Sequence, residues 1–187
     1  MSNAIVKNLS FGDEAKNNVF KGIDKLTKAV SSTLGASGKC VMLENELGKP
    51  VITKDGVTVA NSITLRDPIE NMGATLLKEA ARQTVKEAGD GTTTATVLAH
   101  SILSKAYAEN NSGSREMKKG IEEATKKVIK HLEKVAVPVE GNMINNVATI
   151  SANNDPELGN IIAEAFKEVG KNGVVTMEVS NDSSTSY

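Results

Sequence analysis

The stretch Gly89-Asp90-Gly91-Thr92-Thr93-Thr94-Ala95-Thr96 lies between two segments with helical patterning, residues 68–88 and 94–109. The start of a helix offers backbone N–H groups that have no intrahelical partner, together with the positive end of the helix dipole. Two glycines let an anion approach the backbone closely, three threonines add hydroxyl donors, and Asp90 offers a hard oxygen ligand for Mg²⁺. These are the components of a phosphate–metal site.

The same stretch can also be an ordinary turn between two helices, with Gly89 as the C-cap and a threonine as the next N-cap. A cap needs only one hydroxyl, however, and three consecutive β-branched residues are poor helix formers. The threonine run therefore favours a phosphate site, while the motif taken alone leaves both interpretations open.

The composition argues against several classes of function. The 187 residues are enough for one sizeable domain, or for one and a half, and 22 basic residues nearly balance 23 acidic ones. With this charge and only 3% aromatic residues, we expect no nucleic acid partner. No apolar run reaches the ~20 residues of a membrane span, and residues 1–10 lack the pattern of a signal peptide.

Cys40 is the single cysteine, so it has no partner for an internal disulfide, and we expect a small packed residue there. Together with the absence of membrane and secretion signals, this predicts a soluble intracellular protein, either in the cytoplasm or in an organelle matrix.

The spacing of apolar residues predicts a mainly helical fold. Helices are expected over residues 11–31, 68–88, 94–109, 114–135, 143–151 and 155–170, and their apolar stripes are expected to face a core. Asp67-Pro68-Ile69-Glu70 is a strong helix start. Close helix–helix contact is expected at Gly22, and also along the helix face that contains the small residues Gly73, Ala74 and Ala81.

Short strands are expected at Cys40 to Leu43, at Pro50 to Thr53 and at Val174 to Glu178, where the last has no partner nearby in the sequence. We therefore expect the chain to be part of something longer. The residues Lys54-Asp55-Gly56-Val57 can be the turn of a hairpin, or Asp55 can cap a short helical turn. A second glycine-rich turn, Thr33 to Lys39, lacks the spacing of a P-loop and is a weak signal by itself.

Four segments resemble the group I chaperonins, the GroEL type. They are Thr33-Leu34-Gly35, Ile52-Thr53-Lys54-Asp55-Gly56-Val57, the stretch from Ala88 to Leu98, and Thr149-Ile150-Ser151-Ala152-Asn153. The resemblance extends in order over essentially the whole chain, and its third segment is highly specific to chaperonins.

The resemblance implies two incomplete domains. Residues 1–136 would be the first part of a helical equatorial domain with a small β-hairpin, which binds ATP and forms rings. Residues 137–187 would be the first part of an α/β intermediate domain, the hinge, ending where the apical domain starts. The implied protein is an ATP-hydrolysing chaperone subunit that assists folding of unfolded client proteins. It would act in a homo-oligomeric ring of seven subunits with a co-chaperonin, and this chain would be incompetent alone.

The resemblance also implies roles for individual residues. Those at the nucleotide and its phosphates would be Thr33, Leu34, Gly35, Ala36, Lys54, Gly91, Thr92, Thr93 and Thr94. Asp90 would ligate Mg²⁺, with K⁺ as a further possible ion, and Asp55 would support catalysis near the γ-phosphate. The main water-positioning aspartate would lie outside this chain, and Ile150 and Ser151 would belong to a face that swings towards the nucleotide.

One departure from the family concerns the first glycine turn, where Ala36-Ser37-Gly38 stands in place of Pro-Lys-Gly. The loss of a rigid proline and of a positive charge predicts a lower nucleotide affinity. The alternative function is therefore a non-catalytic, chaperonin-like assembly or scaffold module. A small-molecule kinase using the same phosphate site is a third class, disfavoured because no second substrate site or base is visible.

Overall fold

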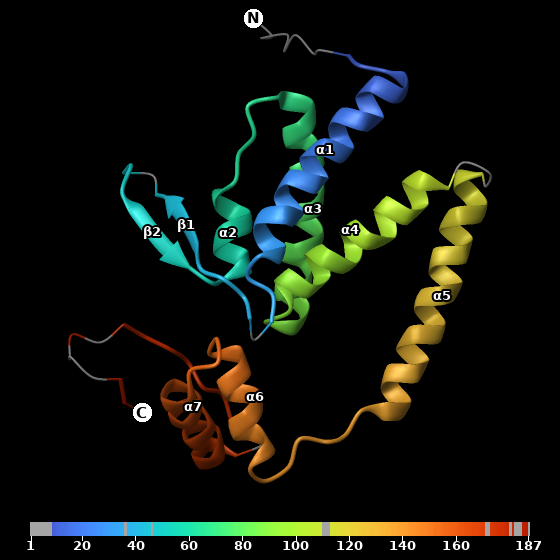
Figure 1. Cartoon of the computed structure of the whole chain (residues 1–187). Coiled ribbons are helices and arrows are strands. Elements are labelled where there is room, and N and C mark those ends of the chain that lie inside the picture. Colours follow the sequence, from blue (N-terminus) through green and yellow to red (C-terminus); the bar gives the residue numbers. More distant parts are fainter. Residues whose placement is uncertain are drawn as a thin grey trace, which may run out of the picture. The chain divides into compact units, whose positions relative to one another are not determined.

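The computed structural model describes residues 9–35, 37–45, 47–109, 113–170, 173–179, 181 and 185–186. The elements are α1 (Gly12–Ser31), β1 (Val41–Glu44), β2 (Pro50–Thr53), α2 (Gly56–Ser62), α3 (Pro68–Ala88), α4 (Thr92–Ala108), α5 (Ser114–Val135), α6 (Met143–Ser151) and α7 (Pro156–Val169) (Figure 1). The fold is thus mainly helical with one small β-hairpin, as the sequence predicted. The chain forms two compact units, Met1–Asn110 and Asn111–Tyr187.

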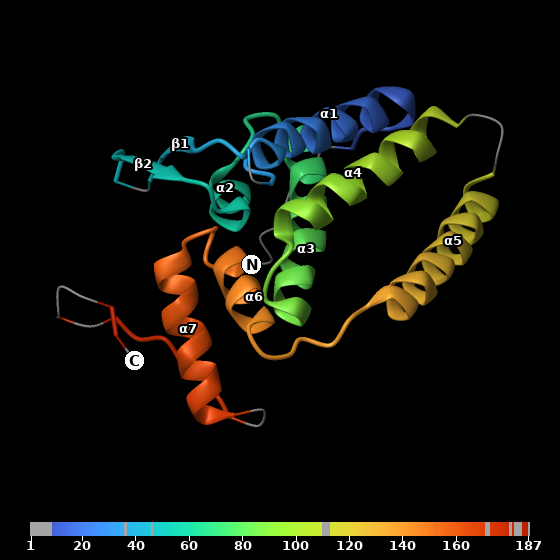
Figure 2. The same cartoon turned by 60° about the horizontal axis from the view of Figure 1, so that its bottom comes forward.

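Helices α1 and α3 of the first unit cross with their backbones in close contact (Figure 2). A Cβ atom placed on Gly22 of α1 would lie 1.7 Å from the carbonyl oxygen of Glu70. One placed on Gly73 of α3 would lie 2.0 Å from the carbonyl oxygen of Val19. Only glycine permits these two contacts, which confirms the close helix packing predicted for both positions.

The core of the first unit lies where α1, α2 and α3 meet. It consists of Ile23, Leu26, Val30, Val59, Ala60, Ala74 and Leu77, all nearly inaccessible to solvent. Burial of a large apolar side chain of this kind stabilises a fold by about 1.5–3 kcal/mol. Because Val30 lies in the last turn of α1, the core holds in place the loop that begins at Thr33.

Strands β1 and β2 form an antiparallel hairpin in which Val41 pairs with Thr53 and Glu44 pairs with Pro50. The turn between them is organised by Asn45, whose Oδ1 accepts hydrogen bonds from the amides of Leu47 and Lys49, each at 2.9 Å. After β2 the chain enters α2 directly. Asp55 therefore caps a helix and is not part of a hairpin turn, which decides between the two alternatives that the sequence left open.

The second unit contains α5 and the helix pair α6–α7, whose members pack against each other (Figures 1 and 2). A Cβ on Gly159 of α7 would lie 2.5 Å from Cα of Thr149 on α6, and Ala163 is fully buried. Asn145 adds polar contacts between the two helices: its Nδ2 donates to Asn160 at 2.9 Å, and its Oδ1 accepts from Lys167 at 2.9 Å.

The expectation that the apolar stripe of α5 faces a core is wrong for the described structure, because this helix buries none of its residues. Its helical conformation is supported locally by the ion pairs Lys118–Glu122 and Lys119–Glu123, at 3.8 and 3.9 Å and four residues apart. Since α5 has no buried residues, packing does not define a domain boundary at its end. The boundary expected between residues 136 and 137 stays a prediction.

Three other expectations differ from the structure. Helix α4 begins at Thr92 and not at Thr94, and Cys40 is exposed. Residues 174–178 form no strand with any described residue, and the side chains of Val174 and Met177 are exposed. A strand needs a hydrogen-bonded neighbour, and the described part of the chain supplies none.

None of the helices within the described ranges is long and apolar enough to cross a membrane.

Candidate functional site

Three segments that are distant in the sequence meet at the start of α4. The Oγ1 atoms of Thr33, in the loop after α1, and of Thr93, in the first turn of α4, lie 3.3 Å apart. Gly56, the first residue of α2, is buried against the same threonine, since a Cβ there would lie 2.1 Å from Thr93 Oγ1. Thr93 thus connects the loop after α1 and the start of α2 to the glycine- and threonine-rich residues 89–96.

The loop between α3 and α4 depends on its two glycines. Gly89 ends α3 with φ 77°, and Gly91 precedes α4 with φ 90°, both in the left-handed region. Helix α4 has no side-chain cap, as is also true of α1, α5 and α6, whereas α2, α3 and α7 are each capped by an aspartate. The backbone N–H groups at the start of α4 are therefore available as donors to an anion.

The consecutive threonines have different surroundings. Thr92 is buried, with 6% of its surface exposed, and its carbonyl oxygen accepts a hydrogen bond from the buried Thr96 hydroxyl at 2.9 Å. Thr93 is half-buried against Thr33, while Thr94 is exposed. A bound anion could thus reach the hydroxyls of Thr93 and Thr94, whereas Thr92 offers its backbone amide.

Asp90 is exposed in the same loop, and its Oδ1 accepts a hydrogen bond from the amide of Gly91 at 2.6 Å. The described residues contain no group of three or more histidine, cysteine or acidic side chains that could hold a metal ion. A single carboxylate can still suit Mg²⁺, which is commonly bound through one or two carboxylates together with phosphate and water oxygens. Asp90 is the residue that would hold it.

Asp55 caps α2 through both carboxylate oxygens. Oδ1 accepts from the amide of Val57 at 3.1 Å, and Oδ2 accepts from the amide and the hydroxyl of Thr58 at 2.8 and 2.6 Å. Burial by itself raises the pKa of the Asp55 carboxyl, but these hydrogen bonds outweigh it, and the pKa lies below its ordinary value of 3.8. The carboxylate is therefore negatively charged at neutral pH.

The other predicted residues lie around this junction. Lys54, Leu34 and Gly35 are exposed, and the loop after α1 is held by backbone hydrogen bonds from Lys39 to Ser32 at 2.8 Å and from Gly38 to Gly35 at 2.9 Å. Ala36 lies outside the described residues. Ile150 and Ser151 belong to α6, in the second unit.

Sequence reasoning missed the parts that Gly56 and Thr58 play. The three-residue spacing from Asp55 to Thr58 is a pattern from which a capping interaction could have been found. The contact of Gly56 with Thr93 had no signal in the sequence, because it depends on how α2 packs against α4.

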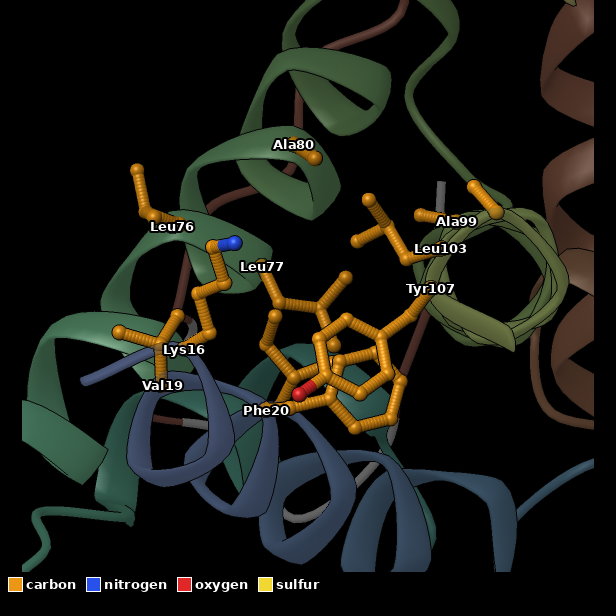
Figure 3. A pocket seen from close by; sticks show the side chains of 11 residues that line it. Lys16, Val19, Phe20, Leu76, Leu77, Ala80, Ala99, Leu103 and Tyr107 are labelled. Atoms are coloured by element: carbon orange, nitrogen blue, oxygen red, sulfur yellow. The ribbon is translucent and has the colours of Figure 1, made fainter. Parts of the chain in front are cut away.

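A separate apolar groove of about 510 Å³ lies between α1, α3 and α4 (Figure 3). Its lining includes Phe20, Leu76, Leu77, Leu103 and Tyr107, and the rings of Phe20 and Tyr107 stack with centroids 5.0 Å apart. Among the described residues, Lys16 is the one charged member of the lining. A surface that is so largely apolar suits a triphosphate less well than the start of α4 does.

A family model described as the TCP-1/cpn60 chaperonin family matches residues 26–185. The crystal structure of chaperonin gp146 from bacteriophage EL 2 (Pseudomonas aeruginosa), obtained in the presence of ATP-BeFx, is 33% identical, with a TM-score of 0.72 over 84% of this chain. The open state of a group III chaperonin is 26% identical, with a TM-score of 0.65 over 83% of this chain.

The chain spans 28% and 31% of the lengths of these two solved chaperonins. The family match, in contrast, includes all three segments that meet at Thr93 and nearly all of the described helices. This chain belongs to the TCP-1/cpn60 chaperonin family.

Proposed function

We propose that this chain forms the nucleotide-binding part of an ATP-dependent protein-folding chaperonin of the group I type. The observation that carries the proposal is the meeting of Thr33, Gly56 and Thr93 at the uncapped start of α4. Amide donors, hydroxyls and one exposed carboxylate are thereby placed around a single helix end, an arrangement that suits a phosphate chain with a divalent cation.

Each residue has a distinct part in this proposal. The backbone amides of residues 92–94 and the hydroxyl of Thr94 donate to phosphate oxygens, while the Thr93 hydroxyl donates to Thr33. Lys54 adds a positive charge next to them, and Thr33 holds its loop against α4. Mg²⁺ bound at Asp90 would neutralise phosphate charge.

Asp55 is proposed to support hydrolysis as a fixed negative charge and hydrogen-bond acceptor for water. Its low pKa keeps the carboxylate ionised and makes it a weak base. We therefore propose that Asp55 orients the water molecule and does not take up its proton. Binding and hydrolysis would bias a two-state hinge within the complete subunit. Ring assembly, a co-chaperonin, unfolded client proteins and a cytoplasmic location are proposed from the family and from the sequence.

The second candidate is a chaperonin-like scaffold that does not bind nucleotide effectively. The observation in its favour is the sequence Ala36-Ser37-Gly38, which offers neither proline nor lysine at the first glycine turn. The two candidates differ in one measurable property, which is the affinity for Mg²⁺-ATP.

The test is calorimetric titration of the protein, expressed in full from its gene, with ATP in the presence and absence of Mg²⁺. Asp90→Ala is compared with Asp13→Ala, a control that removes an exposed carboxylate at the start of α1. We expect Mg²⁺-dependent binding by the wild type and the control, and a loss of at least tenfold in Asp90→Ala. Absence of binding by the wild type would favour the scaffold. Equal binding by Asp90→Ala would show that the metal is held elsewhere.

A further inference from the structure

We propose that Thr58 is a positioning residue for the hydrolytic step: its hydroxyl and amide together fix the orientation of the Asp55 carboxylate beside the start of α4. This inference rests on the proposed function, because it assigns a role within the same nucleotide site. It adds a residue that takes no direct part in binding nucleotide and acts only through Asp55.

The first observation is a difference between Asp55 and the other two aspartate caps. Asp67 and Asp155 each accept two amide hydrogen bonds on Oδ1 alone, at 2.8 and 2.9 Å and at 3.0 and 3.0 Å. These two bonds are sufficient to cap a helix. Asp55 accepts three hydrogen bonds that are divided between its two oxygens. The additional bond comes from the Thr58 hydroxyl, at 2.6 Å.

Three bonds on two oxygens fix the carboxylate more firmly than a cap requires. A carboxylate offers about four acceptor positions. The described residues occupy both positions on Oδ2 and one on Oδ1, which leaves a single position on Oδ1 for water or an ion. Without the hydroxyl, a position on Oδ2 would become open as well, and a single amide hydrogen bond would hold each oxygen.

The second observation is that the start of α2 is held in place on both sides of Asp55. The amide of Asp55 donates to Thr53 Oγ1 at 3.0 Å. Gly56 is buried in contact with Thr93, in the first turn of α4. The Asp55 carboxylate, which Thr58 orients, belongs to this segment. Packing therefore sets the distance between the segment and the proposed phosphate site.

The test uses Thr58→Val, which keeps the shape of the side chain and removes its hydroxyl, and Thr58→Ser, which keeps the hydroxyl. Both are made in the protein expressed in full from its gene. Thr75→Val is the control, because Thr75 is an exposed threonine of α3 whose hydroxyl donates to the carbonyl of Asn71 within the same helix. The measurements are the Kd for Mg²⁺-ATP, the kcat of hydrolysis and its dependence on pH. Folding of each variant is checked by circular dichroism.

For Thr58→Val we expect an unchanged Kd within about twofold and a kcat about tenfold lower, since a hydrogen bond to a charged group is removed. We also expect the acid limb of its pH profile to move to higher pH, because the Asp55 carboxylate loses a donor. Thr58→Ser should restore both kcat and the profile, and Thr75→Val should behave as the wild type. Thr58→Ala replaces the valine variant if the latter fails to fold.

The outcomes separate this inference from the proposed function. A wild type that binds no ATP would overturn the proposed function, and this inference with it. A wild type that binds and hydrolyses ATP, with a Thr58→Val variant of equal kcat and pH profile, would overturn only the role of Thr58. A valine variant that loses affinity and kcat together, without recovery in Thr58→Ser, would show a structural role and would also overturn the positioning role.

Discussion

The hydroxyl oxygens of Thr33 and Thr93 lie 3.3 Å apart, although 60 residues separate them along the chain. Thr33 also donates a hydrogen bond to the carbonyl oxygen of Val30 at 2.8 Å, which leaves its oxygen able to accept one from Thr93. The loop after α1 is thereby connected both to the buried end of its own helix and to the start of α4. This connection underlies the first two predictions.

Replacing Thr93 by valine removes the hydroxyl and keeps the volume of the side chain. We expect the affinity for Mg²⁺-ATP to fall about tenfold, because the hydrogen bond that holds the Thr33 loop at the start of α4 is lost. Calorimetric titration measures the change. Thr125→Val is the control, since Thr125 is exposed and its hydroxyl donates to the carbonyl of Ile121 within α5. Equal affinities for Thr93→Val and the wild type would contradict the assigned site.

Replacing Gly56 by alanine should destabilise the first unit by about 1–3 kcal/mol, because the added methyl group would overlap Thr93 Oγ1. Nucleotide affinity should fall as well, since α2 and α4 must move apart. The control is Gly120→Ala in α5, where a Cβ meets no atom within 4 Å. There the same change should stabilise the helix by about 0.5–1 kcal/mol. Urea unfolding measures both effects, and a stabilising Gly56→Ala would show that α2 does not pack in this way.

Leu26 is completely buried in the core beneath the loop of Thr33. Its replacement by alanine should lower the free energy of unfolding by about 2–5 kcal/mol, through lost burial and the cavity left behind. Leu76→Ala is the matched control, because 65% of the Leu76 surface is exposed. The two variants are compared by urea unfolding. Similar losses of stability in both would be inconsistent with a core centred on α1, α2 and α3.

Asp55 should make stability depend on pH. Its pKa is lower in the folded protein than the ordinary value of 3.8, so its ionised form is favoured by folding. The resulting stability is fully present above the ordinary pKa and is lost as the pH falls through the folded value. Urea unfolding from neutral pH to well below the ordinary pKa of 3.8 should show a smaller acid-induced loss of stability in Asp55→Asn than in the wild type. Parallel curves would contradict the three hydrogen bonds to this carboxylate.

Most helix boundaries follow from short-range signals. Asp67 with Pro68 and Asp155 with Pro156 begin α3 and α7 where the sequence indicates, because a carboxylate cap and a proline at the first position act within a few residues. The start of α4 was predicted two residues late. Thr92 belongs to the helix despite its β-branched side chain, since its burial next to Thr96 outweighs a weak local preference.

The sequence by itself determined the helical class, the hairpin and the family, and it predicted the residue types of the proposed phosphate–metal site. These depend on local chemistry: periodic apolar residues, caps, glycines with positive φ, and a motif of adjacent residues. Only the tertiary structure decided that Asp55 caps a helix and that Gly56, Thr33 and Thr93 meet at one helix end. Such contacts arise when separate elements bury a common core, and the spacing of residues along the chain does not specify which side chains are then brought together.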